Sequence, residues 1–121
     1  MILLVEDDDL VRELLRTFLE SAGHTVMEAA SAEEALNAVA VGPEDLQLLV
    51  TDMNLPRLDG AELARRLGAQ WPRLKVLYMS GNPADHARAL SAGAGVAALS
   101  KPFSRGTLVA AVHALLTSQT G

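Results

Sequence analysis

The sequence predicts an α/β fold in which five parallel strands alternate with five helices. Short apolar runs without polar alternation recur five times along the 121 residues, and such runs are typical of strands buried on both faces of a parallel sheet. Most of these runs are followed by a segment with apolar residues at helical spacing. The alternation indicates right-handed crossovers with helices on both faces of the sheet. The common doubly wound order for five such strands is 2-1-3-4-5.

The first two strands are expected at residues 1–5 and 25–29. The first is wholly apolar and stops at acidic residues, whereas the second is more polar and should lie nearer the sheet edge. The helix between them is predicted to stop near Gly23. Its predicted apolar face comprises Leu10, Val11, Leu14, Leu15, Phe18 and Leu19. A capping box at residues 31–34 starts the second helix, which should run to about Val41, before Gly42-Pro43 breaks the chain.

The remaining strands are expected at residues 48–52, 76–79 and 96–99. The third strand ends at Asp52 and opens a turn-rich loop containing Asp59-Gly60, after which a third helix ends near Trp71. Asn82 has the character of a helix N-cap, so a fourth helix should run from there to about Ser91. The fifth helix should start at Ser104 and bury Leu108, Val109, Val112, Leu115 and Leu116. No linker separates these units, so residues 1–121 are expected to form one domain.

The composition excludes several classes of function. The net charge of -5 and the aromatic content of 3% speak against a nucleic-acid surface and are compatible with binding a divalent cation. With no cysteine, the chain has no disulfide, thiolate nucleophile or zinc–sulfur site. No apolar run approaches the roughly 20 residues that span a bilayer, and no signal peptide is recognisable. We therefore expect a cytoplasmic protein, or a cytoplasmic piece of a larger one, without direct contact with nucleic acid or membrane.

Residues capable of chemistry follow four of the five predicted strands. They are Glu6 and Asp7 after the first strand, Asp52 at the third, Ser80 after the fourth and Lys101 after the fifth. The carboxyl ends of parallel strands share one rim of the sheet. In the order 2-1-3-4-5, strands one and three are neighbours. The acidic residues should therefore gather around one crevice, with Ser80 and Lys101 to one side.

This grouping suits phosphoryl transfer. Carboxylates held together repel one another, and an all-oxygen donor set selects a hard cation such as Mg²⁺. Asp52 is a candidate nucleophile, because a carboxylate can take up a phosphoryl group. A metal, a lysine and a hydroxyl placed around the phosphoryl oxygens would stabilise the charge that develops there.

Over nearly its whole length, the chain resembles a receiver domain of a bacterial two-component response regulator. The motifs that carry the resemblance are Val5-Glu6-Asp7-Asp8, Thr51-Asp52-Met53-Asn54-Leu55-Pro56 with Asp59-Gly60, Met79-Ser80-Gly81 and Lys101-Pro102-Phe103. Residues 77–82 also resemble receivers attached to hybrid sensor histidine kinases. The resemblance implies a flavodoxin-like fold. It also implies a signalling switch with only slow Mg²⁺-dependent self-phosphorylation and self-dephosphorylation, and not an enzyme.

The resemblance assigns roles to the acidic residues. Asp52 would be the phosphoacceptor and a metal ligand. Asp7 would bind Mg²⁺ directly, Glu6 would bind it through water, and Asn54 would supply its backbone carbonyl.

The resemblance also assigns roles to residues near the phosphoryl group. Ser80 would hydrogen-bond that group and move when it arrives, and Lys101 would pair with a phosphoryl oxygen. The Lys101–Pro102 peptide bond would be cis. Ala98 departs from the family pattern, which often has an aromatic residue three positions before the lysine that swings inward on activation. That form of switch cannot operate here, so we expect another route, such as shifts of the fourth helix and fifth strand.

The implied partner is a sensor histidine kinase or a histidine phosphotransfer domain, whose phosphohistidine would donate the phosphoryl group. A homodimer through the fourth helix, fifth strand and fifth helix is a further expectation.

Two rival functions are less well supported by the residues. A Mg²⁺-dependent phosphohydrolase with an aspartate nucleophile generally needs a second acid two residues on, where this chain has Asn54. A degenerate receiver used only for protein binding would not need the intact acidic cluster, Asp52 and Lys101. Asp8 and Asp9 are interpreted as charges favoured by the helix dipole and not as ligands.

Overall fold

The computed structural model describes residues 1–82, 84 and 95–117. Within these ranges the strands are β1 (Ile2–Val5), β2 (Val26–Ala29), β3 (Leu48–Asp52), β4 (Lys75–Ser80) and β5 (Val96–Ser100). The helices are α1 (Asp9–Ser21), α2 (Ala32–Val39), α3 (Gly60–Gln70) and α5 (Arg105–Thr117). The predicted fourth helix falls mostly outside the described residues. At the expected start of this helix, Asn82 Oδ1 accepts a 3.0 Å hydrogen bond from the backbone amide of Ala84, as an N-cap does.

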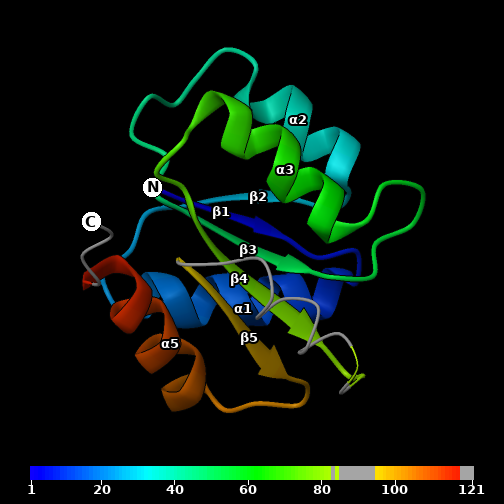
Figure 1. Cartoon of the computed structure of the whole chain (residues 1–121). Helices are drawn as coiled ribbons and strands as arrows, with labels where there is room; N and C mark the ends of the chain where they lie inside the picture. The colour runs from blue at the N-terminus through cyan, green and yellow to red at the C-terminus, as the bar shows by residue number, and fades with distance from the viewer. Residues whose placement is uncertain (83, 85–94, 118–121) are drawn as a thin grey trace.

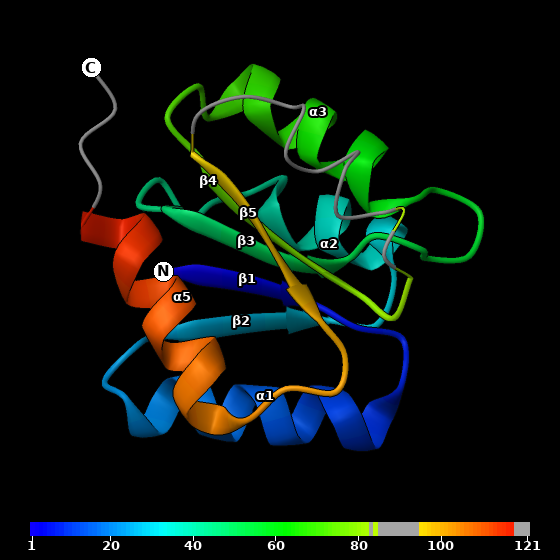
Figure 2. The same ribbon diagram turned by 60° about the horizontal axis from the view of Figure 1, so that its bottom comes forward.

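The sheet is parallel and its strand order is β2-β1-β3-β4-β5, which confirms the predicted topology. In the centre, Thr51 of β3 pairs with Val5 of β1, and Asp52 pairs with Met79 of β4. The more polar β2 lies at an edge, as predicted. Helices α2 and α3 cover one face, and α1 and α5 cover the other (Figure 1, Figure 2). This arrangement leaves the carboxyl ends of all five strands on one rim.

The core consists of two apolar layers, one on each face of the sheet. Alternate residues of a strand point to opposite faces. Leu3 and Leu49 therefore pack in one layer with Leu63 of α3, whereas Leu4 and Val50 pack in the other, which includes the buried residues of α1 and α5. Every residue of β1, β3 and β4 is buried. Burial on both faces explains why these segments read as apolar runs without alternation.

The helices are short and end at local signals. Gly23 follows α1 with φ 94, a left-handed conformation that suits glycine. Ser31 caps α2, because its Oγ accepts a 3.0 Å hydrogen bond from the backbone amide of Glu34. α2 ends at Val39, earlier than the predicted end near Val41. Gly42 has a φ of 124°, which no helix can include, so it marks the predicted break in the chain. Among the described helices, none has both the length and the apolar character that crossing a bilayer demands.

Two residues of the predicted apolar face of α1 do not belong to the core. Leu10 and Leu14 are 79% and 51% exposed, so that part of the prediction is wrong. Each residue advances about 100° around a helix, which places Leu14 about 100° and Leu10 about 140° from the buried Leu15. They therefore lie on the flank of α1. In α5, Val109 and Leu116 are only partly buried for the same reason, since Leu108 and its helical neighbours face the sheet.

Candidate functional site

Three ionisable side chains from three strands meet at the carboxyl rim of the sheet. Asp52 is the last residue of β3, Glu6 follows β1 and Lys101 follows β5. The Lys101 ammonium lies 2.7 Å from Asp52 Oδ1 and 2.9 Å from Glu6 Oε2. Since β4 separates β3 from β5, the long lysine side chain reaches across the end of β4 to make these contacts. The structure thus brings together three residues that the sequence places on one rim.

Asp7 adds a third carboxylate to this group. One carboxylate oxygen from each of Glu6, Asp7 and Asp52 lies within 4.8 Å of the others. Glu6 and Asp52 are buried, and Asp7 is exposed. Hard divalent cations prefer such oxygen ligands, and Mg²⁺ keeps several of its waters, which the exposed side at Asp7 allows. These three residues could therefore hold a divalent metal ion.

The site perturbs the acidity of its own groups. Burial raises the pKa of Asp52 to about 7, and the hydrogen bond and charge of Glu6 act in the same direction, against Lys101. Burial also opposes ionisation of Glu6, but its hydrogen bonds with Asp52 and Lys101 outweigh burial and lower its pKa. Lys101 loses solvation too, yet its bonds to both carboxylates raise its pKa. Near neutral pH, Glu6 and Lys101 are therefore ionised, while Asp52 is divided between its two forms.

The turn between β1 and α1, which carries Glu6 and Asp7, is held at several points. Asp8 caps α1 by accepting two backbone amides of its first turn at 3.0 and 3.1 Å. The Asp8 amide donates to Glu6 Oε1 at 3.3 Å. Arg12 Nη1 donates to the Glu6 carbonyl at 2.9 Å. Asp8 thus serves the helix, as predicted, and the turn is fixed from both its side chains and its backbone.

The loop after β3 closes tightly on the strand that carries Asp52. The Met53 amide donates to the Met79 carbonyl at 3.0 Å, and the Gly60 amide donates to the Met53 carbonyl at 2.9 Å. A Cβ atom at Gly60 would lie 2.2 Å from the Asp52 carbonyl oxygen. Asp59 caps α3 through a 2.8 Å hydrogen bond to an amide of its first turn. Only glycine permits this approach, and the approach fixes the backbone at Asp52.

Two further predicted site residues lie near this cluster. Asn54 is exposed in the loop after Asp52, and the metal-ligand role of its carbonyl stays a prediction. Ser80 is buried at the end of β4, where its Oγ accepts the Asn82 amide at 3.0 Å. The Ser80 carbonyl accepts the Lys101 amide at 2.9 Å. Ser80 is thus joined to Lys101 through the backbone, and its contact with a phosphoryl group stays a prediction.

The region around Lys101 agrees with the resemblance in one respect and departs from it in another. The Lys101–Pro102 peptide bond is cis, which confirms that prediction. Ala98 pairs with Tyr78 of β4, and both belong to the same apolar layer. Tyr78 is buried. The aromatic side chain at this level of the sheet therefore comes from β4 and already lies inside the core.

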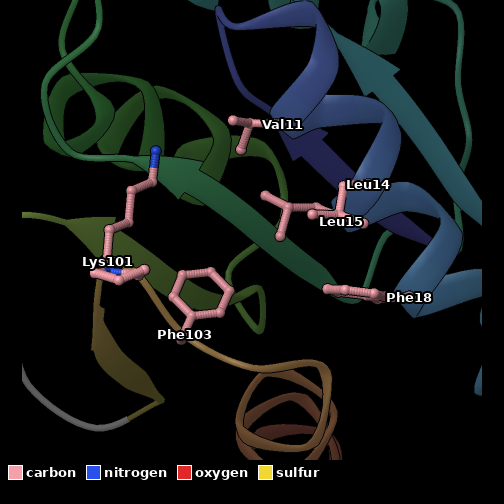
Figure 3. Close-up of a pocket in the computed structure, with 7 residues that line it drawn as sticks. Val11, Leu14, Leu15, Phe18, Lys101 and Phe103 are labelled. Atoms are coloured by element: carbon pink, nitrogen blue, oxygen red, sulfur yellow. The ribbon is translucent and has the colours of Figure 1, made fainter.

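An apolar pocket of about 210 Å³ opens beside Lys101, between α1 and the segment that follows β5. Its lining comprises Val11, Leu14, Leu15, Phe18, Lys101, Pro102 and Phe103. In Figure 3 the α1 side chains lie on one side and the Phe103 ring on the other, while the Lys101 ammonium extends toward the end of β3. The exposed Leu14 is thus part of an apolar surface that adjoins the acidic cluster.

The sequence did not indicate how Arg12 and Gly60 shape the site. An arginine on a helix is usually a solvated charge, so Arg12 gives no signal of its backbone contact with Glu6. The Asp59-Gly60 pair predicts a turn, but not the close approach of Gly60 to Asp52. Both contacts depend on how separate elements pack, which local patterns do not encode.

Comparison with known proteins identifies the type of domain. A family model described as a response regulator receiver domain matches residues 2–113. The chain is 40% identical to the sensor kinase CckA of Brucella abortus over 98% of this chain and 13% of that protein. It is 39% identical to the transcriptional regulatory protein FixJ of Azorhizobium caulinodans over 93% of this chain and 53% of that protein. The chain therefore spans about half of one relative and a small part of the other.

Solved structures agree with the sequence comparison. The receiver domain of the hybrid histidine kinase CckA has a TM-score of 0.81 and 32% identity, covering 96% of this chain and 98% of that one. The receiver domain of NtrX from Brucella abortus has a TM-score of 0.84 and 31% identity, covering 98% of this chain and 100% of that one.

Proposed function

The chain belongs to the response regulator receiver domain family, and from this premise we propose that Asp52 accepts a phosphoryl group from a phosphohistidine on a partner protein. The position of Asp52 carries the proposal. Its carboxylate stands at the end of the central strand, 2.7 Å from the Lys101 ammonium and within a cluster of carboxylates. A nucleophile, a fixed positive charge and oxygen donors for a cation are the parts that phosphoryl transfer to a carboxylate uses.

In the proposed transfer, a carboxylate oxygen of Asp52 attacks the donor phosphorus in line with the phosphorus–nitrogen bond. The new oxygen–phosphorus bond forms as the phosphorus–nitrogen bond breaks. The bonding electrons leave with the imidazole nitrogen of the donor. The other ring nitrogen of the donor carries a proton, so the leaving group ends as neutral imidazole. The Lys101 ammonium supplies positive charge for a phosphoryl oxygen. The attacking group must be the carboxylate, so the form of Asp52 that carries a proton is inactive.

The donor set fits Mg²⁺, which we propose as the cofactor. Asp7 and Asp52 would bind the ion directly, with the Asn54 carbonyl from the adjoining loop. Both carboxylate oxygens of Glu6 already accept hydrogen bonds, from Lys101 and from the Asp8 amide. This engagement supports contact between Glu6 and the metal through water. Bound Mg²⁺ would offset the negative charge of the phosphoryl oxygens.

Phosphorylation would replace the contact of Lys101 with the Asp52 carboxylate by a contact with the more highly charged phosphoryl group. It would thereby shift the equilibrium between two conformations of the domain. Ser80 and Lys101 share a backbone hydrogen bond between β4 and the segment after β5. A shift of either residue toward the phosphoryl group would therefore be transmitted to the other. Because Ala98 provides no aromatic side chain, we propose that the response travels through β5 and the segment after β4.

The donor is proposed to be a sensor histidine kinase or a histidine phosphotransfer domain. The exposed Leu14 lines the apolar pocket that ends at Lys101. An exposed apolar surface next to the reacting group supports docking of a protein donor at this side of the domain.

We propose a signalling switch whose own chemistry is limited to slow self-phosphorylation and self-dephosphorylation. The rival phosphohydrolase lacks its second acid, because Asn54 stands two residues past Asp52. A homodimer through the fourth helix, β5 and α5, a cytoplasmic location and the absence of direct contact with nucleic acid or membrane also stay predictions.

Intact mass spectrometry after incubation with acetyl phosphate and Mg²⁺ tests the proposal. We expect one added phosphoryl group on the native chain and none without Mg²⁺ or in Asp52→Asn. Asp59→Asn is the matched control, because it changes a carboxylate in the same loop that caps α3 and should leave the adduct intact.

Two results would count against the proposal. An adduct that persists in Asp52→Asn would place the phosphoryl group on another residue. No adduct, together with no binding of the phosphoryl analogue beryllofluoride, would favour the degenerate receiver that only binds proteins.

A further inference from the structure

Arg12 connects the acidic turn to two other elements. Its side chain lies in the first turns of α1 and is 15% exposed. Nη1 donates to the Glu6 carbonyl at 2.9 Å, Nη2 donates to Asp9 Oδ1 at 2.7 Å, and Nε lies 3.7 Å from Glu28 Oε1. One guanidinium therefore joins the turn after β1, the start of α1 and the edge strand β2.

The contact with the Glu6 carbonyl bears directly on Asp7. That carbonyl belongs to the peptide group between Glu6 and Asp7, and a peptide group is planar. Fixing the direction of the carbonyl therefore fixes the plane from which Asp7 departs. Glu6 is also held by its own burial and by Lys101. Asp7 is the exposed member of the carboxylate cluster, so its placement depends more on the backbone.

We propose that Arg12 is a positioning residue for the metal site, which holds the peptide group between Glu6 and Asp7 so that the Asp7 carboxylate lies within reach of Asp52. The inference rests on the proposed metal role of Asp7. Arg12 would act on the metal site through the backbone, since it contacts the Glu6 carbonyl and none of the carboxylate oxygens of Glu6, Asp7 and Asp52.

The shape of the side chain supports this role. A guanidinium presents five N–H donors in a rigid plane, whereas a lysine presents one compact charge. Lysine at position 12 could reach one of the three oxygens but not hold all of them. Asp9 and Glu28 contact the other two guanidinium nitrogens, so they keep Nη1 directed at the Glu6 carbonyl.

Arg16 provides a matched control within the same helix. It lies one turn further along α1 and also contacts β2, with Nη1 3.2 Å from Glu28 Oε2. Its other ion pair is with Glu20, where Nε lies 3.7 Å from Oε1. Arg16→Gln therefore removes the same charge and a contact with the same strand, but leaves the turn after β1 in place.

Calorimetric titration with Mg²⁺ of the native chain, Arg12→Gln, Arg12→Lys and Arg16→Gln tests the proposal. Residues that orient metal ligands typically change metal affinity by 10–100-fold, so we expect Arg12→Gln to weaken Mg²⁺ binding about tenfold. Arg12→Lys should recover about half of that loss on a logarithmic scale, and Arg16→Gln should stay within about twofold of the native affinity. In NMR spectra, the Asp7 amide should shift in Arg12→Gln and keep its position in Arg16→Gln.

Native Mg²⁺ affinity in Arg12→Gln would overturn the inference. An equal loss in Arg16→Gln would also overturn it, since the effect would then follow from charge alone. If Arg12→Gln does not fold, Arg12→Lys and Arg16→Gln provide the comparison. The proposed function fails separately, if the native chain binds Mg²⁺ but takes up no phosphoryl group.

Discussion

Asp52 combines two properties that conflict at neutral pH. Its burial raises its pKa to about 7, yet a carboxyl group attacks phosphorus only as the carboxylate. A cation placed among the three carboxylates would favour the ionised form, because an opposite charge nearby lowers a carboxyl pKa. The metal would therefore do more than neutralise the phosphoryl group. It would also bring the nucleophile into its reactive state.

Asp52→Asn should stabilise the metal-free protein more at pH 8 than at pH 5. The folded pKa of Asp52, about 7, exceeds its ordinary value of 3.8. A group with a raised folded pKa favours folding at low pH, and that contribution is lost as the pH rises through the folded pKa. Asparagine does not titrate, so the gain at pH 8 should exceed that at pH 5 by roughly 2–3 kcal/mol, because pH 5 lies about two units below the folded pKa and each unit is worth about 1.4 kcal/mol. Urea unfolding in the presence of a chelator measures both values. Equal gains at the two pH values would contradict the raised pKa.

Lys101→Met should destabilise the metal-free protein and make its stability more dependent on Mg²⁺. Glu6 is 2% exposed and Asp52 is 8% exposed. The variant would therefore leave these two buried carboxyl groups without the positive charge of the Lys101 ammonium. We expect a loss of roughly 2 kcal/mol in the free energy of unfolding. Added Mg²⁺ should stabilise the variant more than the native chain, because it replaces the missing positive charge. Equal stabilisation of both proteins in thermal melts would show that Lys101 does not balance these carboxylates.

At the scale of the elements, the loop between β3 and α3 leaves no space for a side chain at Gly60. A Cβ at Gly60 would meet the backbone of Asp52 and Met53, and backbone cannot move aside as a flexible side chain can. Gly60→Ala should therefore lower the free energy of unfolding by about 2 kcal/mol or more and reduce phosphorylation by acetyl phosphate.

Gly68→Ala is the control for this prediction. Gly68 lies within α3 and has open space around it, so alanine there should stabilise the protein by about 0.5–1 kcal/mol. If chemical unfolding gives both variants the same change in free energy, the close approach at Gly60 does not constrain the loop.

Helix α1 shows what hydrophobic spacing can and cannot predict. The pattern correctly identifies a helix and its buried residues Leu15 and Leu19. It also includes Leu10 and Leu14, which are exposed, because a wide apolar stripe covers both the core face and a flank. The sequence therefore predicts where apolar residues gather on the helix, but not which of them face the sheet and which adjoin the pocket beside Lys101.

At the scale of the whole molecule, the alternation of strands and helices predicted a parallel sheet with helices on both faces, and the strand order came from the order common to such folds. A parallel sheet places the ends of all its strands on one rim, so Glu6, Asp7, Asp52 and Lys101 could be expected together before any contact was known. Local patterns could not predict the contact of Arg12 with Glu6, because it depends on how α1 is oriented against the turn after β1. The raised pKa of Asp52 was also out of reach, since it results from burial and from the neighbouring Glu6.

Locating the phosphoryl group on the chain tests the central claim most directly. After reaction with acetyl phosphate and Mg²⁺, borohydride reduces an acyl phosphate to an alcohol, which marks the modified carboxyl group for peptide mass spectrometry. The account predicts a mark at Asp52 that disappears when Mg²⁺ is omitted. A mark at Glu6 or Asp7, or equal marking without Mg²⁺, would contradict it.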